Sequence, residues 1–429
     1  MGQGAVRIAH GDCLEVLDRM AAEGIWVDGC LTDPPYHLAS IVSRLGNPDA
    51  APIQSGATGV YARGSAGFMG QKWDGGDIAF RVETWRKVYA VMRPGAHLIA
   101  FSATRSYHRM VCAIEDAGFE IRDMVPWLYG TGFPKSHNQD GEWDGWGTAL
   151  KPAIEPVVLA RKPLVGSVSE NMRLFGTGAI NIDACRIPIG EENFDGGGQS
   201  RNGVRLANHH EGWRRPWMDD PDAVAAHQIR LQENIERARD LGRWPANIAH
   251  DGSDEVIGAF PHSAGALAPV KQSSGRKANK VYGKFSANNE STPRGDSGSA
   301  ARFFYSAKAT EGERIFECRQ CGAHTIGRPD CGHDPEQFRT HPTVKPIDLM
   351  RWYVRMIMPP GGLVLDPFAG TGTTAAAARD EGVNSLLIEQ DIDHVRDCCV
   401  RLGITIDEAL TTPVTGRAVN QSSCGPLFA

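Results

Sequence analysis

Four consecutive residues combine the groups that could hold a planar heterocycle carrying an amino group. They are Asp33, Pro34, Pro35 and Tyr36. The Asp33 carboxylate and the Pro34 carbonyl can each accept one amino hydrogen. The proline rings restrict the backbone that presents these acceptors, and the Tyr36 ring can stack on the heterocycle. A plain turn closed by a core tyrosine is the alternative. We interpret this segment, the Asp33 loop, as one that grips an aromatic amine.

A second segment, residues 366–374, reads Asp-Pro-Phe-Ala-Gly-Thr-Gly-Thr-Thr and follows an apolar run. In this glycine loop, Gly370 and Gly372 lack the Cβ atoms that would block close approach of a nucleotide-like ligand. Close packing of a strand and a helix is the alternative reason for these glycines. Glu389, after the next apolar run, could accept hydrogen bonds from both ribose hydroxyls. The loop lacks the Gly-Lys-Ser/Thr ending of a phosphate cradle and the three-glycine dinucleotide pattern. An adenosine ligand without a polyphosphate therefore fits best.

Residues of the types that bind metals cluster between positions 318 and 333. They are Cys318, Cys321, Cys331 and His333, with His324 as a substitute. Paired soft ligands near turns suit tetrahedral zinc. The spacing of the last pair is not that of a standard zinc finger, and reduced surface cysteines are the alternative. The cluster is a candidate structural zinc site.

Alternating strands and helices must position the Asp33 loop. The apolar periodicity predicts strands at 6–9, 25–31 and 97–101, and helices at 14–22 and 82–92. A Pro94-Gly95 turn is expected before the third of these strands. The two prolines end the strand at 25–31, because neither offers a backbone N–H to a ladder. The Asp33 loop is therefore expected at the carboxyl end of a strand.

The carboxyl-terminal part of the chain has the same alternation. We predict a helix from about 346 to 357, a strand at 363–366, a helix at 373–380 and a strand at 385–388. This pattern at both ends indicates a doubly wound parallel α/β sheet whose halves are separated in sequence. Ligands of such sheets bind at the carboxyl ends of strands. The Asp33 loop and the glycine loop share one crevice if their strands are neighbours.

The segment between these halves differs in character. The predicted divisions are 1–130 and 341–410 for the two parts of the α/β domain, 131–340 for an insert, and 411–429 for a tail. The insert is rich in Gly and Asn and has one predicted helix near 223–241. It contains a basic stretch with few acids, formed by Lys271, Arg276, Lys277, Lys280 and Lys284. A solvated charged face is the alternative, but we expect this stretch to face phosphates.

Composition narrows the classes of protein. Of 429 residues, 41% are hydrophobic and 22% charged, as in ordinary globular proteins. Because 45 basic and 51 acidic residues leave a net charge of −6, contact with nucleic acid requires a local basic surface. Ten cysteines are too sparse for a disulfide scaffold. No apolar run reaches the roughly 18 residues of a membrane span. We expect a cytoplasmic protein with no membrane partner.

The pairing of Asp33-Pro-Pro-Tyr36 with Asp366-Pro-Phe-Ala-Gly-Thr-Gly372 resembles the DNA methyltransferases that methylate amino groups with S-adenosylmethionine (SAM). The order of the motifs, with the catalytic loop first, resembles the β class. Segments at 130–136, 302–305 and 341–346 are similar to those of phage- and prophage-borne relatives. The resemblance implies a Rossmann-like SAM methyltransferase sheet with an inserted DNA-recognition domain. It also implies double-stranded DNA as the partner, and many relatives are homodimers.

The resemblance assigns roles to individual residues. In the catalytic loop Asp33 to Tyr36, Asp33 and Pro34 would hold the target amino group and Tyr36 would stack on a flipped-out base. The residues expected to bind the cofactor are Asp12 at the adenine, Glu389 at the ribose, and Thr343, Lys345, Asp366, Phe368, Gly370, Gly372 and Thr373 toward the methionine. Thr343 could instead be only a helix cap. Trp127, or Tyr129, is placed like a second wall of the base pocket, although either could be core.

Adenine N6 is the expected target, because Asp at the first motif position accompanies adenine more often than cytosine in the family that the chain resembles. Cytosine N4 is the alternative. A cytosine C5 methyltransferase is excluded, since the chain has no Pro-Cys dipeptide for its nucleophile. Methyltransferases of RNA or protein typically carry the two motifs in the reverse order. An oxidoreductase would leave the Asp33 loop unexplained, and a non-catalytic DNA-binding module would need neither loop.

Overall fold

The computed structural model describes residues 4–36, 77–132, 136–189, 219–262, 299–308, 310–340 and 344–413. The chain divides into two compact units. The first comprises Met1–Asn181, Asn247–Asp251 and Ser306–Ala429, and the second comprises Ile182–Ala246 and Gly252–Tyr305. Among the described residues, none of the helices has the length and apolar character needed to cross a membrane.

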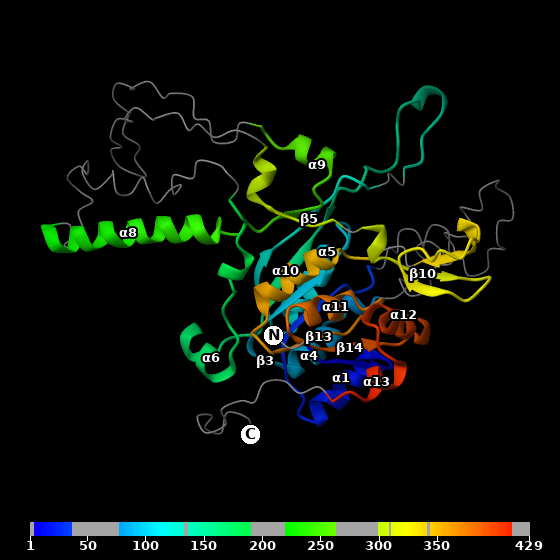
Figure 1. The fold of residues 1–429 in the computed structure, drawn as a ribbon, viewed down its shortest axis with the longest axis horizontal. Coiled ribbons are helices and arrows are strands. Elements are labelled where there is room, and N and C mark those ends of the chain that lie inside the picture. Colours follow the sequence, from blue (N-terminus) through cyan, green and yellow to red (C-terminus); the bar gives the residue numbers. More distant parts are fainter. Residues whose placement is uncertain are drawn as a thin grey trace. The chain divides into compact units, whose positions relative to one another are not determined.

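A seven-stranded sheet forms the centre of the first unit (Figure 1). In spatial order its strands are β1 (Val6–His10), β14 (Asn384–Glu389), β13 (Leu363–Asp366), β2 (Val27–Thr32), β3 (Met92–Phe101), β7 (Val157–Arg161) and β4 (Glu120–Met124). The five strands from β1 to β3 are parallel, and β7 is antiparallel to both of its neighbours. Strands from both ends of the chain thus share one sheet, which confirms the predicted split α/β fold.

Helices pack on both faces of this sheet (Figure 1). They are α1 (Cys13–Ala22), α4 (Val82–Val91), α5 (Tyr107–Asp116), α11 (Thr373–Asp380), α12 (Ile392–Leu402) and α13 (Ile406–Thr411). Helices α6 (Val168–Phe175) and α10 (Ile347–Ile357) contact β3. Leu386 and Ile388 belong to the core that contains α1, α4 and α5, whereas Leu387 belongs to the core of α11, α12 and α13. Because successive strand residues point to opposite faces, one strand serves two cores. The doubly wound arrangement is confirmed.

The start of β3 differs from the predicted Pro94-Gly95 turn. The strand begins at Met92, directly after α4, and continues through both residues. Gly95 has a φ of +75°, and a Cβ atom there would lie 2.2 Å from the Asn171 side chain. The register of the β2–β3 pairing also shifts near the start of the two strands. The Pro-Gly pair is therefore an irregularity within a buried strand rather than a turn.

The predicted boundary at residue 130 also differs from the structure. Strand β7 lies beyond it, yet pairs with β3 in the central sheet. All five residues of β7 are buried, as a strand flanked by two others and covered on both faces requires. The second unit is smaller than the predicted insert. It contains α8 (Pro221–Leu241), close to the predicted helix, and α9 (Asp254–Ala259).

Two smaller sheets contain strands of the region that was predicted to be inserted. In the first unit, β5 (Trp127–Leu128) pairs with β6 (Ile154–Glu155) and β8 (Ala249–His250). A three-stranded antiparallel sheet has β10 (Ile315–Cys318) between β11 (His324–Ile326) and β12 (Phe338–Thr340). This small sheet carries the cysteine cluster at its end.

Candidate active site

The Asp33 loop and the glycine loop leave the sheet side by side. Their strands, β2 and β13, are hydrogen-bonded neighbours, with Cys30 paired to Leu365. At the carboxyl ends of these strands, the Thr32 hydroxyl donates a hydrogen bond of 2.6 Å to Oδ1 of Asp366. Both side chains are buried. The adjacency that the shared crevice requires is therefore present, and a buried hydrogen bond joins the two strand ends.

Asp366 organises the start of the glycine loop. Its Oδ2 accepts a 2.6 Å hydrogen bond from the Thr374 hydroxyl, and its Oδ1 accepts one of 3.1 Å from the Phe368 backbone N–H. Burial raises the pKa of Asp366 to about 6, although these donors and Thr32 act in the opposite direction. Both oxygens of this carboxylate thus accept hydrogen bonds from the chain itself. Asp366 therefore shapes the glycine loop, in addition to its predicted role in ligand binding.

The two glycines of the loop serve different needs. Gly372 has a φ of +76°, and a Cβ atom there would lie 3.0 Å from the Cys398 sulfur of α12. At Gly370, where φ is +51°, a Cβ atom would meet nothing within 4 Å. Close packing against α12 is therefore a reason for Gly372, the alternative that the sequence left open. At Gly370 the left-handed backbone is the constraint.

Glu389 ties β14 to the glycine loop. Its Oε2 accepts a 2.8 Å hydrogen bond from the Gly370 backbone N–H, and its Oε1 accepts one of 2.9 Å from the Asp391 backbone N–H. His394 Nδ1 lies 3.7 Å from Oε1. Burial alone would lower the pKa of His394, but the contact with Glu389 outweighs it and raises that pKa. Each carboxylate oxygen keeps one lone pair, so Glu389 can still accept hydrogen bonds from a ligand.

A cavity of about 320 Å³ lies between these loops. Its walls include nine predicted site residues, namely Asp12, Asp33, Pro35, Lys345, Asp366, Phe368, Gly370, Thr373 and Glu389. They also include residues for which the sequence held no signal, such as Arg81, Met350 and His394. Pro34, Tyr36 and Gly372 do not line it. The size and the mixed polar and apolar walls suit a small organic ligand.

Asp12 has a second role. It is the N-cap of α1, and its Oδ1 accepts hydrogen bonds from the backbone N–H groups of Leu14 at 2.8 Å and Glu15 at 3.2 Å. The cap places a carboxylate at the cavity wall while satisfying the free N–H groups of the first helical turn. Only Oδ2 of Asp12 remains for a ligand.

A polar cluster lies behind the Asp33 loop. Lys345 Nζ forms ion pairs of 2.9 Å with Asp33 Oδ2 and 2.8 Å with Glu155 Oε2, and it donates a 3.0 Å hydrogen bond to the Tyr36 hydroxyl. That hydroxyl donates to Asp33 Oδ1 at 2.7 Å and lies 3.2 Å from Glu155 Oε2. Burial opposes the charge on Lys345, but the two carboxylates outweigh it and raise the pKa of this lysine. The cluster holds two carboxylates against one ammonium group.

Two features of this cluster differ from the sequence analysis. Glu155 was missed, because it lies in the predicted insert and only the pairing of β6 with β5 brings it to the site. Tyr36 was expected to stack on a base, whereas its hydroxyl is held by the cluster. Burial, followed by the charges of Asp33 and Glu155, raises the pKa of Tyr36. The stacking role of its ring stays a prediction.

Trp127 and Tyr129 lie next to each other, with ring centroids 5.2 Å apart. The Trp127 indole N–H donates to the Ala307 carbonyl at 3.2 Å, so its polar edge is used within the fold. Burial and the nearby charge of Glu155 raise the pKa of Tyr129 to about 12, with Lys345 acting in the opposite direction. Tyr129 is therefore within electrostatic reach of the polar cluster. The basic stretch and Thr343 lie outside the described residues.

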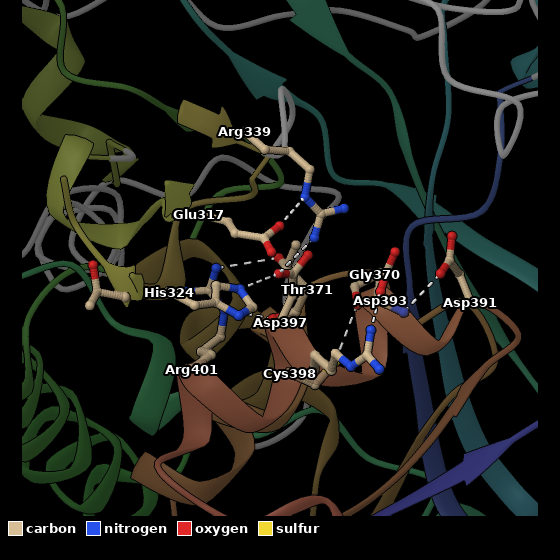
Figure 2. A network of polar contacts seen from close by, with 12 residues as sticks. Glu317, His324, Arg339, Gly370, Thr371, Asp391, Asp393, Asp397, Cys398 and Arg401 are labelled. Atoms are coloured by element: carbon tan, nitrogen blue, oxygen red, sulfur yellow. Dashed lines mark hydrogen bonds and ion pairs between the residues drawn. The ribbon is translucent and has the colours of Figure 1, made fainter. Parts of the chain in front are cut away.

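The four predicted metal ligands come together. One side-chain donor atom from each of Cys318, Cys321, Cys331 and His333 lies within 4.8 Å of the others. His324 does not join them, because its Nε2 contacts Asp397 Oδ1 at 2.7 Å (Figure 2). The structure thus selects His333 over the substitute.

Known DNA methylases are similar to this chain in sequence. A family model described as DNA methylase, of the N6/N4 type, matches residues 27–398. The type II methyltransferase M.HindIII of Haemophilus influenzae is 28% identical over 116 residues, which are 23% of this chain and 38% of that protein. The DNA adenine methyltransferase YhdJ of Escherichia coli is 35% identical over 69 residues, which are 16% of this chain and 24% of that protein. The chain thus matches less than half the length of either relative.

Solved structures of low identity also align with the chain. The M1.HpyAVI–SAM complex is 13% identical, with 93% of this chain and 100% of that chain covered and a TM-score of 0.38. The cytosine-N4-specific PvuII DNA methyltransferase is 12% identical, with 95% of this chain and 91% of that chain covered and a TM-score of 0.39.

The family match spans both motif loops and most of the chain, so this protein belongs to the N6/N4 DNA methylase family.

Proposed function

We propose that this protein is a DNA methyltransferase that moves a methyl group from SAM to the N6 amino group of adenine. The observation that carries the proposal is the meeting of the Asp33 loop and the glycine loop at one cavity, through neighbouring strands. One loop offers acceptors for an amino group, and the other offers a close backbone approach to a nucleoside. Membership of the N6/N4 DNA methylase family supports the same reaction class.

The walls of the cavity fit SAM. Glu389 keeps free lone pairs for ribose hydroxyls, and Asp12 keeps one oxygen free at the wall. When bound, SAM supplies an electrophilic methyl group on a sulfonium centre. The chain's own residues need only bind SAM, orient the target amino group toward it and exclude water.

The amino group of adenine is a weak nucleophile, because its lone pair is delocalised into the ring. Two acceptors that hold its hydrogens, the Asp33 carboxylate and the Pro34 carbonyl, favour a pyramidal nitrogen whose lone pair is free to attack. Lys345 and Tyr36 each occupy one position on Asp33 and fix its orientation. The carboxylate retains lone pairs for the substrate. Catalysis is then mainly positioning and local electrostatics.

Nitrogen loses one proton as the N–C bond forms, and that proton becomes acidic only when nitrogen gains the methyl group. Asp33 therefore does not have to be a strong base. It accepts the proton or passes it to water, while the Lys345 ion pair holds its carboxylate in place. The reacting base must leave the duplex to reach this position.

Adenine is favoured over cytosine because the motif begins with Asp, and the name of YhdJ, an adenine methyltransferase, agrees with that choice. N4 of cytosine is the second candidate, since its amino group presents the same two hydrogens to the same acceptors. RNA or protein amino groups are less favoured by the order of the two motifs. We further propose that the predicted insert recognises double-stranded DNA and that the protein acts in the cytoplasm as a homodimer, the state of many relatives.

Nucleoside mass spectrometry tests the proposal. Unmethylated DNA with varied sequence is incubated with SAM and the native protein, or with Asp33→Ala. N6-methyladenine from the native protein alone is the expected result. N4-methylcytosine would keep the mechanism and replace the base assignment. If SAM binds and RNA or protein is methylated while DNA is not, the substrate class is wrong.

A further inference from the structure

We propose that Cys318, Cys321, Cys331 and His333 bind a structural zinc ion, and that this ion supports the cofactor cavity through α12. The metal site itself depends only on the residues of the small sheet. The link to the cavity rests on the proposed function in one respect, that the ligand there is SAM. Both parts can be tested separately.

The donor atoms have the proximity that a tetrahedral site needs. All four lie within 4.8 Å of one another, and Cys318 Sγ is 3.3 Å from His333 Nδ1. Zinc–sulfur bonds of about 2.3 Å place the sulfurs of a tetrahedral site about 3.8 Å apart. Three thiolates and one imidazole are soft or borderline ligands. Such ligands suit zinc, whereas magnesium and calcium bind oxygen ligands.

The backbone turns that deliver these ligands depend on glycine. Gly322 follows Cys321 with a φ of +72°, and Gly332 separates Cys331 from His333 with a φ of +70°. The Gly322 N–H donates to the Cys318 carbonyl at 2.8 Å, which closes the first turn. The backbone of a residue with a side chain rarely adopts this left-handed conformation. Both ligand pairs are therefore held by tight turns, as in zinc knuckles.

The small sheet has only a small apolar core of its own. Its strands are four, three and three residues long. In the described part of 310–340, the buried apolar side chains are Ile315, Phe316 and Cys318. A core of this size does not offset the conformational entropy of so many ordered residues. A metal ion that joins both ends of the segment supplies the missing free energy, as in small zinc domains.

The small sheet is tied to α12 through residues that pair with Glu317, the residue before Cys318. His324 Nε2 contacts Asp397 Oδ1 at 2.7 Å, and Arg339 Nη2 lies 3.5 Å from the same oxygen. Arg339 also donates to Glu317 Oε2 at 2.8 Å. Figure 2 shows these side chains converging on Asp397. Strands β11 and β12 each contribute one residue to the contact with Asp397, and Glu317 of β10 holds Arg339.

Helix α12 in turn holds the glycine loop. Arg401 Nε donates to the Thr371 carbonyl at 2.7 Å, and its Nη1 donates to the Glu313 carbonyl at 2.9 Å. The Cys398 thiol donates to the Gly370 carbonyl at 3.2 Å (Figure 2). Arg401 is buried, so it joins the segment before β10 directly to the glycine loop. Loss of order in the small sheet should therefore loosen the wall of the cofactor cavity.

Metal analysis tests the first part. The full-length protein, purified without chelators, should contain about one zinc per chain by inductively coupled plasma mass spectrometry. Cys321→Ser and Cys331→Ser should each contain less than about a tenth of an equivalent. Cys112→Ser is the matched control, because Cys112 is an exposed free cysteine on α5. Native protein without zinc, or zinc retained by both cluster variants, would overturn the site.

Calorimetric titration with SAM tests the second part. Removal of zinc with a chelator should raise the Kd for SAM about fivefold or more, and re-addition of zinc should restore it. Asp397→Asn should keep the zinc yet weaken SAM binding, because it breaks the link and not the site. An unchanged Kd after zinc removal would overturn the link alone. Failure of the zinc-loaded native protein to bind SAM would instead refute the proposed function.

Discussion

At the scale of single residues, the polar cluster around Asp33 decides what the loop can do. Asp33 is held from one side by Lys345 and from the other by Tyr36, and Glu155 supplies a second negative charge. The carboxylate thereby has one orientation before any substrate arrives. Such preorganisation is the main resource of an enzyme that transfers a group without forming a covalent intermediate with the protein.

Asp33→Ala should lower kcat by about a thousandfold or more, since one of the two acceptors for the amino group is lost. The Kd for SAM should change little, because Lys345 keeps Glu155 as a partner and the glycine loop is untouched. Steady-state kinetics and calorimetric titration measure the two effects. Asp116→Ala, an exposed acid at the end of α5, is the control and should behave as the native protein. Loss of SAM binding in Asp33→Ala would contradict this division of roles.

Asp366 should leave a signature in the pH dependence of stability. Its pKa is about 6 in the folded protein, whereas an unfolded Asp has a pKa near 3.9. Between these values the folded state holds the proton more tightly, so this residue makes the free energy of unfolding fall as pH rises from about 4 to about 6. Urea denaturation of the native protein and Asp366→Asn across that range gives the difference. A difference in stability that does not vary with pH would contradict the shifted pKa.

At the scale of elements, the glycine loop shows how packing and ligand access share one turn. The loop begins at a buried aspartate, passes two glycines with positive φ and becomes the first turn of α11. On one side it accepts hydrogen bonds from α12, and on the other it faces the cavity. A substitution at Gly372 therefore disturbs the packing against α12, whereas one at Gly370 strains only the backbone of the loop.

Gly372→Ala should destabilise the protein more than Gly370→Ala. Both substitutions force alanine into a left-handed conformation, at a cost of about 1 to 2 kcal/mol. Only Gly372→Ala also drives a Cβ atom to 3.0 Å from the Cys398 sulfur, so it should cost about 1 kcal/mol more. Urea denaturation without SAM measures both variants, each serving as the other's control. Equal costs would mean that α12 moves freely away from the loop.

At the scale of the whole molecule, segments from both ends of the chain build the first compact unit, and both parts of the second unit lie between these end segments in sequence. The net charge of −6 gives no general attraction to DNA. Under the proposed function, affinity for DNA would then come from local basic segments, of which the stretch from Lys271 to Lys284 is the clearest in the sequence.

Replacing Lys271, Lys277, Lys280 and Lys284 together with Gln should weaken DNA binding and reduce its salt dependence. Each lysine that no longer neutralises a phosphate lowers the slope of log K against log salt by about 1. Binding of SAM should stay as in the native protein, which makes it the internal control. Fluorescence anisotropy at several salt concentrations provides the slope. An unchanged slope would assign these lysines to a solvated face.

The local features of this protein could be predicted from its amino-acid sequence. Strand and helix periodicity, the Pro-Pro stop after β2 and the spacing of Cys318, Cys321 and Cys331 depend on near neighbours along the chain. Resemblance then attached a reaction class to the two loops. The family match bears out that class and leaves the roles of individual residues as predictions.

Which distant residues meet depends instead on the folded chain. The pairing of β2 with β13 brings the two loops together, and the pairing of β6 with β5 delivers Glu155 to Lys345. Folding also turns His324 toward Asp397 rather than the metal cluster, and places Cys398 against Gly372. Such contacts depend on the burial and register of segments far apart in the chain. Local sequence carries no record of them, because strand order is set by how the whole core packs.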